Sequence, residues 1–149
     1  MTALVFVDTN VLLYTHDERD LDKQARAREW VGWCWRQRAG RISTQVLNEF
    51  YNNAITKFRK SVTLQEARHQ VTRLRLWQPP HLDVYTVDGA WALQDRYPLS
   101  YWDALIVSSA HQQGCACLLS EDLQHGQLLD AVRVVNPFQA LPADLPALT

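Results

Sequence analysis

The chain has 149 residues, of which 47% are hydrophobic and 21% charged, and its net charge is −1 at neutral pH. These values are typical of one globular domain with a full core, and they argue against a protein that grips nucleic acid over its whole surface. No apolar run approaches the roughly 20 residues needed to span a bilayer, and we see no signal peptide. We therefore expect a cytoplasmic protein without a membrane partner.

The first predicted element is the apolar run Leu4–Val7, which leads into Asp8-Thr9-Asn10. Because the run does not alternate with polar residues, it predicts a strand buried on both faces, as in a parallel sheet covered by helices. Parallel α/β sheets bind ligands beyond the carboxyl ends of their strands. Asp8 lies at such an end, and we interpret it as either a helix cap or a metal ligand.

Helical and extended patterns alternate along the rest of the chain. Helical spacing predicts helices over residues 10–14, 21–38 (closed by Gly40), 45–60, 63–77, 88–96 and 100–113. Apolar or β-branched runs predict further strands over residues 41–44, 83–87, 115–119 and 132–135. This alternation indicates right-handed crossovers and an α/β fold, with a central parallel sheet of about five strands flanked by helices. We expect one domain over residues 1–139 and a loose tail over residues 140–149.

Three further carboxylates are of interest beside Asp8. Asp122 follows the predicted strand 115–119, Asp103 lies in the first turn of the predicted helix 100–113, and Glu49 lies inside the predicted helix 45–60. Singly, they could be a turn residue, a capping-box residue and a solvated helix position. Together they have a second interpretation, because the alternation places at least Asp8 and Asp122 at one edge of the sheet.

Carboxylates that converge in this way repel one another. A pair about 4 Å apart costs roughly 4 kcal/mol at an effective dielectric constant near 20, so a cluster requires protons or cations. Oxygen ligands without organised His or Cys favour Mg²⁺ or Mn²⁺. Such an ion can lower the pKa of a bound water and stabilise charge on a phosphate, which is the equipment for cleaving phosphodiesters.

This ordered set of motifs resembles a PIN domain, and most closely the VapC-type ribonuclease toxins of type II bacterial toxin–antitoxin pairs. The resemblance covers nearly the whole chain. It implies a parallel sheet flanked by helices, Mg²⁺-dependent endoribonuclease activity, a homodimer and a cognate antitoxin protein. The motifs that carry it are Asp8-Thr9-Asn10, Glu49, Tyr101-Trp102-Asp103-Ala104-Leu105-Ile106 and Ser120-Glu121-Asp122-Leu123.

Carried over by position, Asp8 and Asp103 match the principal metal-binding acids of the family, and Glu49 and Asp122 match the other two. Ser120 could hold a water or a phosphate oxygen, and Glu121 stays open as an alternative to Asp122. The resemblance thus implies that water activated by Mg²⁺, or by Mn²⁺ as a substitute, hydrolyses RNA phosphodiesters.

Two other functions fit part of the pattern. One is a PIN-like binding module without catalytic activity. The other is a Mg²⁺-dependent phosphatase of the haloacid-dehalogenase type, which needs a second aspartate where this chain has Asn10. Basic side chains could steer a phosphate backbone or could simply be solvated helix faces. They are Arg36, Arg38, Arg41, Lys57, Arg59 and Lys60.

Overall fold

The computed structural model describes residues 2–149. It contains a five-stranded sheet in the order β2-β1-β3-β5-β4. Neighbouring strands among the first four in this order are parallel, whereas β4 pairs antiparallel with β5 at the edge. The strand bounds are β1 Val5–Val7, β2 Gly40–Arg41, β3 Cys117–Leu119, β4 Leu128–Leu129 and β5 Val132–Val135.

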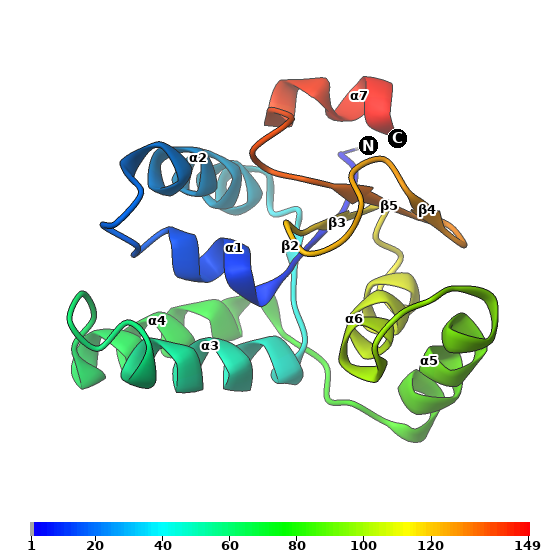
Figure 1. Ribbon diagram of the computed structural model, residues 1–149, viewed down its shortest axis with the longest axis horizontal. Helices are drawn as coiled ribbons and strands as arrows, with labels where there is room; N and C mark the ends of the chain where they lie inside the picture. Colours follow the sequence, from blue (N-terminus) through cyan, green and yellow to red (C-terminus); the bar gives the residue numbers. More distant parts are fainter. Residues whose placement is uncertain (1) are drawn as a thin grey trace.

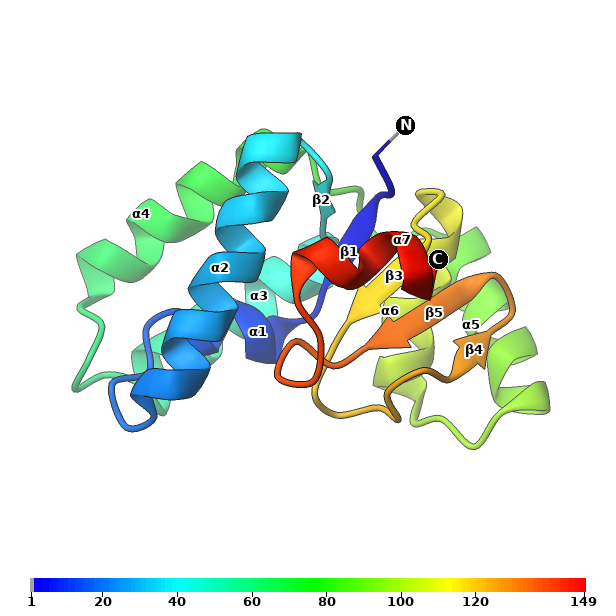
Figure 2. The ribbon, with the colours of Figure 1, turned by 90° about the horizontal axis from the view of Figure 1, so that it is seen from above.

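Helices cover the sheet on both sides (Figures 1 and 2). Helices α5 and α6 lie against one face and α7 lies over the other, while α1 to α4 pack together beside the β2 edge. The helices are α1 Thr9–Tyr14, α2 Leu21–Gln37, α3 Thr44–Thr56, α4 Leu64–Leu74, α5 Val84–Arg96, α6 Tyr101–Gln112 and α7 Leu145–Leu148, with 3₁₀ turns η1 Arg75–Trp77 and η2 Pro142–Asp144.

The core explains why the apolar runs form central strands. Every residue of β1 and β3 is buried, because helices cover both faces of these strands. Trp30 of α2 is completely buried, whereas Trp33 and Trp35 pack only partly against the core. The α/β class with a mainly parallel, helix-flanked sheet is therefore confirmed. None of the helices in the described part of the chain is long and apolar enough to cross a membrane.

The strand predicted over residues 83–87 is wrong, because these residues cap and begin α5. The Asp83 carboxylate accepts a hydrogen bond from the Thr86 amide at 2.9 Å and closes a capping box. Helix α5 then docks on α6, where the Ser108 hydroxyl donates to the Thr86 carbonyl at 2.9 Å. At Gly89 an added Cβ would lie 2.4 Å from the Ser108 hydroxyl oxygen, so glycine permits this close approach. Packing against α6 overrides the β-branched composition.

The expected helix end at Gly40 is also wrong, and one strand was not predicted. The residue in the left-handed conformation after α2 is Arg38, with φ of 53°, whereas Gly40 belongs to β2. The sheet reaches five strands through β4, which is too short to leave a pattern in the sequence.

The C-terminal tail is ordered by packing, so the expectation of a loose segment over residues 140–149 is wrong. It forms η2 and α7, and Leu145 is only 4% exposed. The buried indole of Trp30 donates its N–H to the Ala140 carbonyl at 3.0 Å. The tail thus contributes to the core against α2.

Candidate functional site

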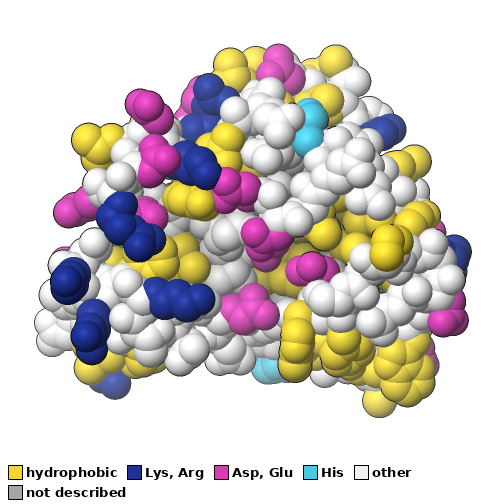
Figure 3. Space-filling view, in the orientation of Figure 1, with side chains coloured by type: hydrophobic (Ala, Val, Ile, Leu, Met, Phe, Trp, Pro, Cys, Tyr) yellow, Lys and Arg dark blue, Asp and Glu magenta, His cyan; other side chains and the backbone are white. Residues whose placement is uncertain are grey.

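The four predicted acids line one open cavity of about 610 Å³, which we call the acid pocket. Asp8 follows β1, Glu49 lies on α3, Asp103 lies in the first turn of α6, and Asp122 follows β3. Because β1 and β3 are parallel neighbours, the chain leaves both strands at the same edge of the sheet. Figure 3 shows acidic side chains near the middle of this face, with Lys and Arg side chains beside them over α1 to α4.

Asp8 both caps a helix and faces the pocket. Its Oδ1 accepts the Thr9 amide at 2.7 Å as the N-cap of α1, and its Oδ2 accepts the Ser120 hydroxyl at 2.7 Å. Burial raises the pKa of Asp8 to about 7, against the lowering effect of these two hydrogen bonds, and the charges of Asp122 and Asp103 raise it further. The ionised carboxylate is therefore costly unless a cation lies nearby.

Glu49 is held in place from both of its oxygens. The Thr9 hydroxyl donates to Oε2 at 2.7 Å, and the Gln45 amide donates to Oε1 at 2.9 Å. The interpretation of Glu49 as a freely solvated helix residue therefore does not hold. Gln45 was not singled out in the sequence, although its position four residues before Glu49 places both side chains on one face of α3.

Asp103 is positioned by the start of α6. The Ser100 hydroxyl caps this helix by accepting the Asp103 amide at 3.1 Å. Partial burial raises the pKa of the Asp103 carboxyl; a hydrogen bond with Ser100 opposes this rise, and the charges of Asp122 and Glu49 add to it. The acids thus lie close enough to affect one another electrostatically.

The loop after β3 carries two adjacent acids, and only Asp122 lines the pocket. The Asn10 amide donates to its carboxylate at 2.9 Å, and the Asp122 amide donates to the Ser120 hydroxyl at 3.2 Å. The Glu121 carboxylate instead forms an ion pair with Lys23 of α2. The geometry therefore favours Asp122 over Glu121 as the fourth acid.

The oxygen atoms that the acid pocket offers as metal ligands suit a hard divalent cation. Two buried carbonyl oxygens, Asn10 Oδ1 and Gln45 Oε1, belong to pocket residues and have no hydrogen-bond partner among the described residues. In residues 2–149 no three Asp, Glu, His or Cys side chains converge closely enough to enclose an ion by themselves. Water would have to complete the coordination, and Mg²⁺ ordinarily retains several water ligands.

Part of the wall of the acid pocket is basic and aromatic. Arg19 and Lys57 line it, and the Arg19 guanidinium lies 4.9 Å from the ring centre of Phe58 while it pairs with Asp17. Trp102 forms part of the rim and is 62% exposed. Such a wall can bind phosphate groups and unstacked bases beside the acids.

Fold and site together define an α/β protein with an acidic ligand pocket at the carboxyl edge of its parallel strands. The sequence model of the PIN domain family matches residues 5–131, a stretch that contains all four acids. The chain belongs to the PIN domain family.

Three solved structures share this fold. FitAcB from Neisseria gonorrhoeae is 13% identical with a TM-score of 0.63, covering 92% of this chain and 100% of its own. VapBC2 from Rickettsia felis, bound to a DNA fragment from its promoter, is 12% identical with a TM-score of 0.59. The match covers 89% of this chain and 98% of that chain. VapC20 from Mycobacterium tuberculosis, a sarcin-ricin loop cleaving toxin, is 17% identical with a TM-score of 0.54. The match covers 76% of this chain and 86% of that chain. No curated protein sequence matches the chain significantly.

Proposed function

We propose that this protein is a Mg²⁺-dependent endoribonuclease and the toxin of a toxin–antitoxin pair. The observation that carries the proposal is the convergence of four acids, from four separate segments, on one cavity at the edge of the sheet. Membership of the PIN domain family supports it. So does the shared fold with VapC20, which is described as a toxin that cleaves the sarcin-ricin loop.

In this proposal Asp8, Glu49, Asp103 and Asp122 hold the magnesium ion, and Mn²⁺ can replace it. A bound ion would supply the positive charge that activates water and stabilises a phosphate in the transition state. The protein's own hydrogen bonds fix the ligands. Ser120 holds Asp8 at 2.7 Å, and Thr9 holds Glu49 at the same distance. These bonds pre-orient the carboxylates, as outer hydrogen-bonding partners commonly do at metal sites.

The basic and aromatic wall binds the RNA in this proposal. Lys57 is exposed at the pocket and can bind a backbone phosphate without carrying sequence information. The exposed ring of Trp102 lies next to Asp103 and can stack on an unpaired base beside the scissile phosphate. Single-stranded or looped RNA is therefore the expected substrate class.

The direct test is cleavage of a labelled RNA by purified protein. Cleavage is expected with Mg²⁺ or Mn²⁺, and not in excess EDTA or with Asp8→Asn, while circular dichroism shows that the variant is folded. The products should carry 5′-phosphate and 3′-hydroxyl ends. Full activity in EDTA or in Asp8→Asn would contradict the proposal, and RNA binding without any cleavage would favour the binding-module alternative.

A cognate antitoxin and a homodimer complete the proposal. Exposed apolar side chains on α5, over which Figure 3 shows a hydrophobic surface, offer area for a protein partner. They are Val84, Tyr85 and Trp91, which are 68%, 73% and 56% exposed. Induced expression should arrest growth in the parent but not in Asp8→Asn, and a co-expressed antitoxin should relieve the arrest. Light scattering measures whether the protein is a dimer.

A further inference from the structure

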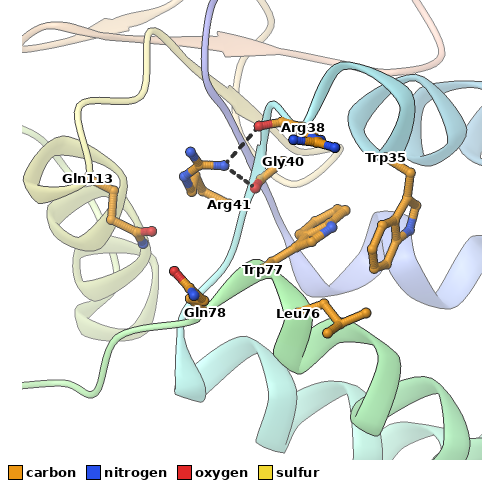
Figure 4. A pocket seen from close by; sticks show the side chains of 8 residues that line it. All are labelled: Trp35, Arg38, Gly40, Arg41, Leu76, Trp77, Gln78 and Gln113. Carbon is orange, nitrogen blue, oxygen red and sulfur yellow. Dashed lines mark hydrogen bonds between the residues drawn. The ribbon is translucent and has the colours of Figure 1, made fainter.

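A second cavity, of about 430 Å³, is shown in Figure 4. It lies at the opposite end of β1 from the acid pocket. Gly40 of β2 pairs with Val5 at the start of β1, whereas Asp8 follows the end of that strand. We call this cavity the Arg–Trp pocket. The residues that matter for its chemistry are Trp35, Arg38, Arg41, Trp77, Gln78 and Gln113.

The Arg–Trp pocket contains two guanidinium groups and no acid. No Asp or Glu belongs to its lining, and neither Arg38 nor Arg41 forms an ion pair within residues 2–149. Arg41 is fixed by its Nη1, which donates to the Gly40 carbonyl at 2.8 Å and the Arg38 carbonyl at 3.2 Å. Its other N–H groups are left for a ligand, and the guanidinium fork matches phosphate oxygens.

The side of the pocket opposite Arg41 is aromatic. The rings of Trp35 and Trp77 lie 5.1 Å apart at 52°. An added Cβ at Gly40 would lie 2.5 Å from the Trp77 ring, so glycine allows the ring to lie against β2. Figure 4 shows the two tryptophans on one side and Arg41 with both glutamines on the other. A planar group can therefore lie on the aromatic side while its polar edge meets the amides.

The backbone of the pocket is strained at two places. Arg38 and Gln78 have φ of 53° and 52°, and they are two of the three non-glycine residues with positive φ in the described chain. Glycine would adopt this conformation without the steric cost. Both residues are C-caps, Arg38 of α2 and Gln78 of η1, so the left-handed turns that end these two elements place both residues at the pocket.

We propose that the Arg–Trp pocket binds one nucleotide unit: its phosphate at Arg38 and Arg41, and its base against the tryptophans. Gln113 donates its amide N–H to the Ile42 carbonyl at 3.1 Å, which directs its Oε1 as an acceptor for the base edge. The volume lies in the range of small-ligand sites, which favours one nucleotide over an extended peptide. That the nucleotide belongs to an RNA strand rests on the proposed ribonuclease function. The recognition of a phosphate and a base by this pocket does not depend on that function.

The test measures binding by isothermal titration calorimetry to full-length protein that carries Asp8→Asn, in EDTA, so that cleavage cannot interfere. The probes are adenosine monophosphate, a four-nucleotide RNA, adenosine and inorganic phosphate. Adenosine monophosphate, the four-nucleotide RNA or both should bind saturably, and at least tenfold more tightly than adenosine or phosphate. Comparison of the first two distinguishes a free nucleotide from a nucleotide within RNA.

Variants locate the binding. Arg38→Gln and Arg41→Gln should each weaken it at least tenfold, and Arg59→Gln, an exposed charge outside the pocket, should not change it. Thermal melts check folding, and Arg38→Gln is decisive if Arg41→Gln unfolds. The inference is overturned if none of the probes binds saturably, or if binding is insensitive to both arginine substitutions. RNA cleavage without nucleotide binding here would overturn this inference alone.

Discussion

The acid pocket and the Arg–Trp pocket lie at opposite ends of the strand pair β1–β2 and have opposite electrostatic character. The first gathers four carboxylates, and the second pairs two guanidinium groups with two tryptophans and no acid. A net charge of −1 conceals this separation. Ligand chemistry in this protein is therefore set by the local charge of each pocket and not by the net charge of the chain.

The largest effect expected concerns Asp8 in metal-free protein. Its pKa is about 7 in the folded state against an ordinary value of 3.8, so between these values the folded state keeps a proton that the unfolded chain has released. The free energy of unfolding must then fall as pH rises from about 4 to 7, by roughly 4 kcal/mol. Asp8→Asn removes this loss and keeps a good N-cap.

Urea denaturation in EDTA at pH 5 and pH 8 measures this difference. The parent should lose stability between the two values much more than Asp8→Asn does. Arg41→Gln, in the other pocket, should retain the pH dependence of the parent. Parallel curves for the parent and Asp8→Asn would show that Asp8 carries no such electrostatic cost.

A pair of neighbouring acids tests whether position in the acid pocket decides function. Asp122→Asn should slow RNA cleavage at least about 100-fold, or roughly 2.7 kcal/mol. Glu121→Gln should stay within about threefold of the parent, because Glu121 pairs with Lys23 and does not line the acid pocket. Single-turnover cleavage rates measure both variants. Equal losses would place the fourth ligand elsewhere in this loop.

Substitution of two exposed tryptophans distinguishes the loss of base stacking from a general effect of removing an aromatic side chain from the surface. Trp102→Ala should raise the KM for RNA about tenfold, since stacking of a base on an aromatic ring contributes about 1–3 kcal/mol. Trp91→Ala serves as the matched control, because Trp91 is 56% exposed on α5 and does not line the acid pocket. Steady-state kinetics would contradict the role of Trp102 if both substitutions raised KM alike.

The smallest effect concerns the left-handed backbone at Arg38. Arg38→Gly should stabilise the protein by up to about 1 kcal/mol, because glycine avoids the steric cost although it loses more entropy on folding. The same substitution should weaken nucleotide binding. The urea midpoint measures the gain, and a loss of stability would mean that the Arg38 side chain holds the end of α2 in place. In both pockets, then, function would be kept at some expense of stability.

Part of the fold could be predicted because burial leaves a pattern in the sequence. The unbroken apolar runs ending at Val7 and Leu119 mark strands covered on both faces, and Asp8 and Asp122 follow them. Residues 83–87 have the composition of a strand and form a helix, since the contacts with α6 that decide their structure come from distant residues. The order of residues 140–149 could not be predicted either, because it depends on contact with the distant residue Trp30.

The candidate sites differ in the same way. Parallel strands end at one edge of the sheet, so Asp8 and Asp122 could be grouped from topology alone, whereas Glu49 and Asp103 on the helices were added by the family resemblance. No such rule groups Trp35, Trp77 and Gln113, which meet only because α2, η1 and the end of α6 pack around β2. The basic residues considered together in the sequence also divide in space, with Arg38 and Arg41 in the Arg–Trp pocket and Lys57 in the acid pocket.

The two outermost strands of the sheet, β2 and β4, are two residues long each. Unpaired backbone groups on long, exposed outer strands act as templates on which other chains add, and this addition leads to aggregates. Strands this short offer few such groups to an incoming chain. The architecture that carries the two pockets should therefore withstand high expression without forming intermolecular sheets.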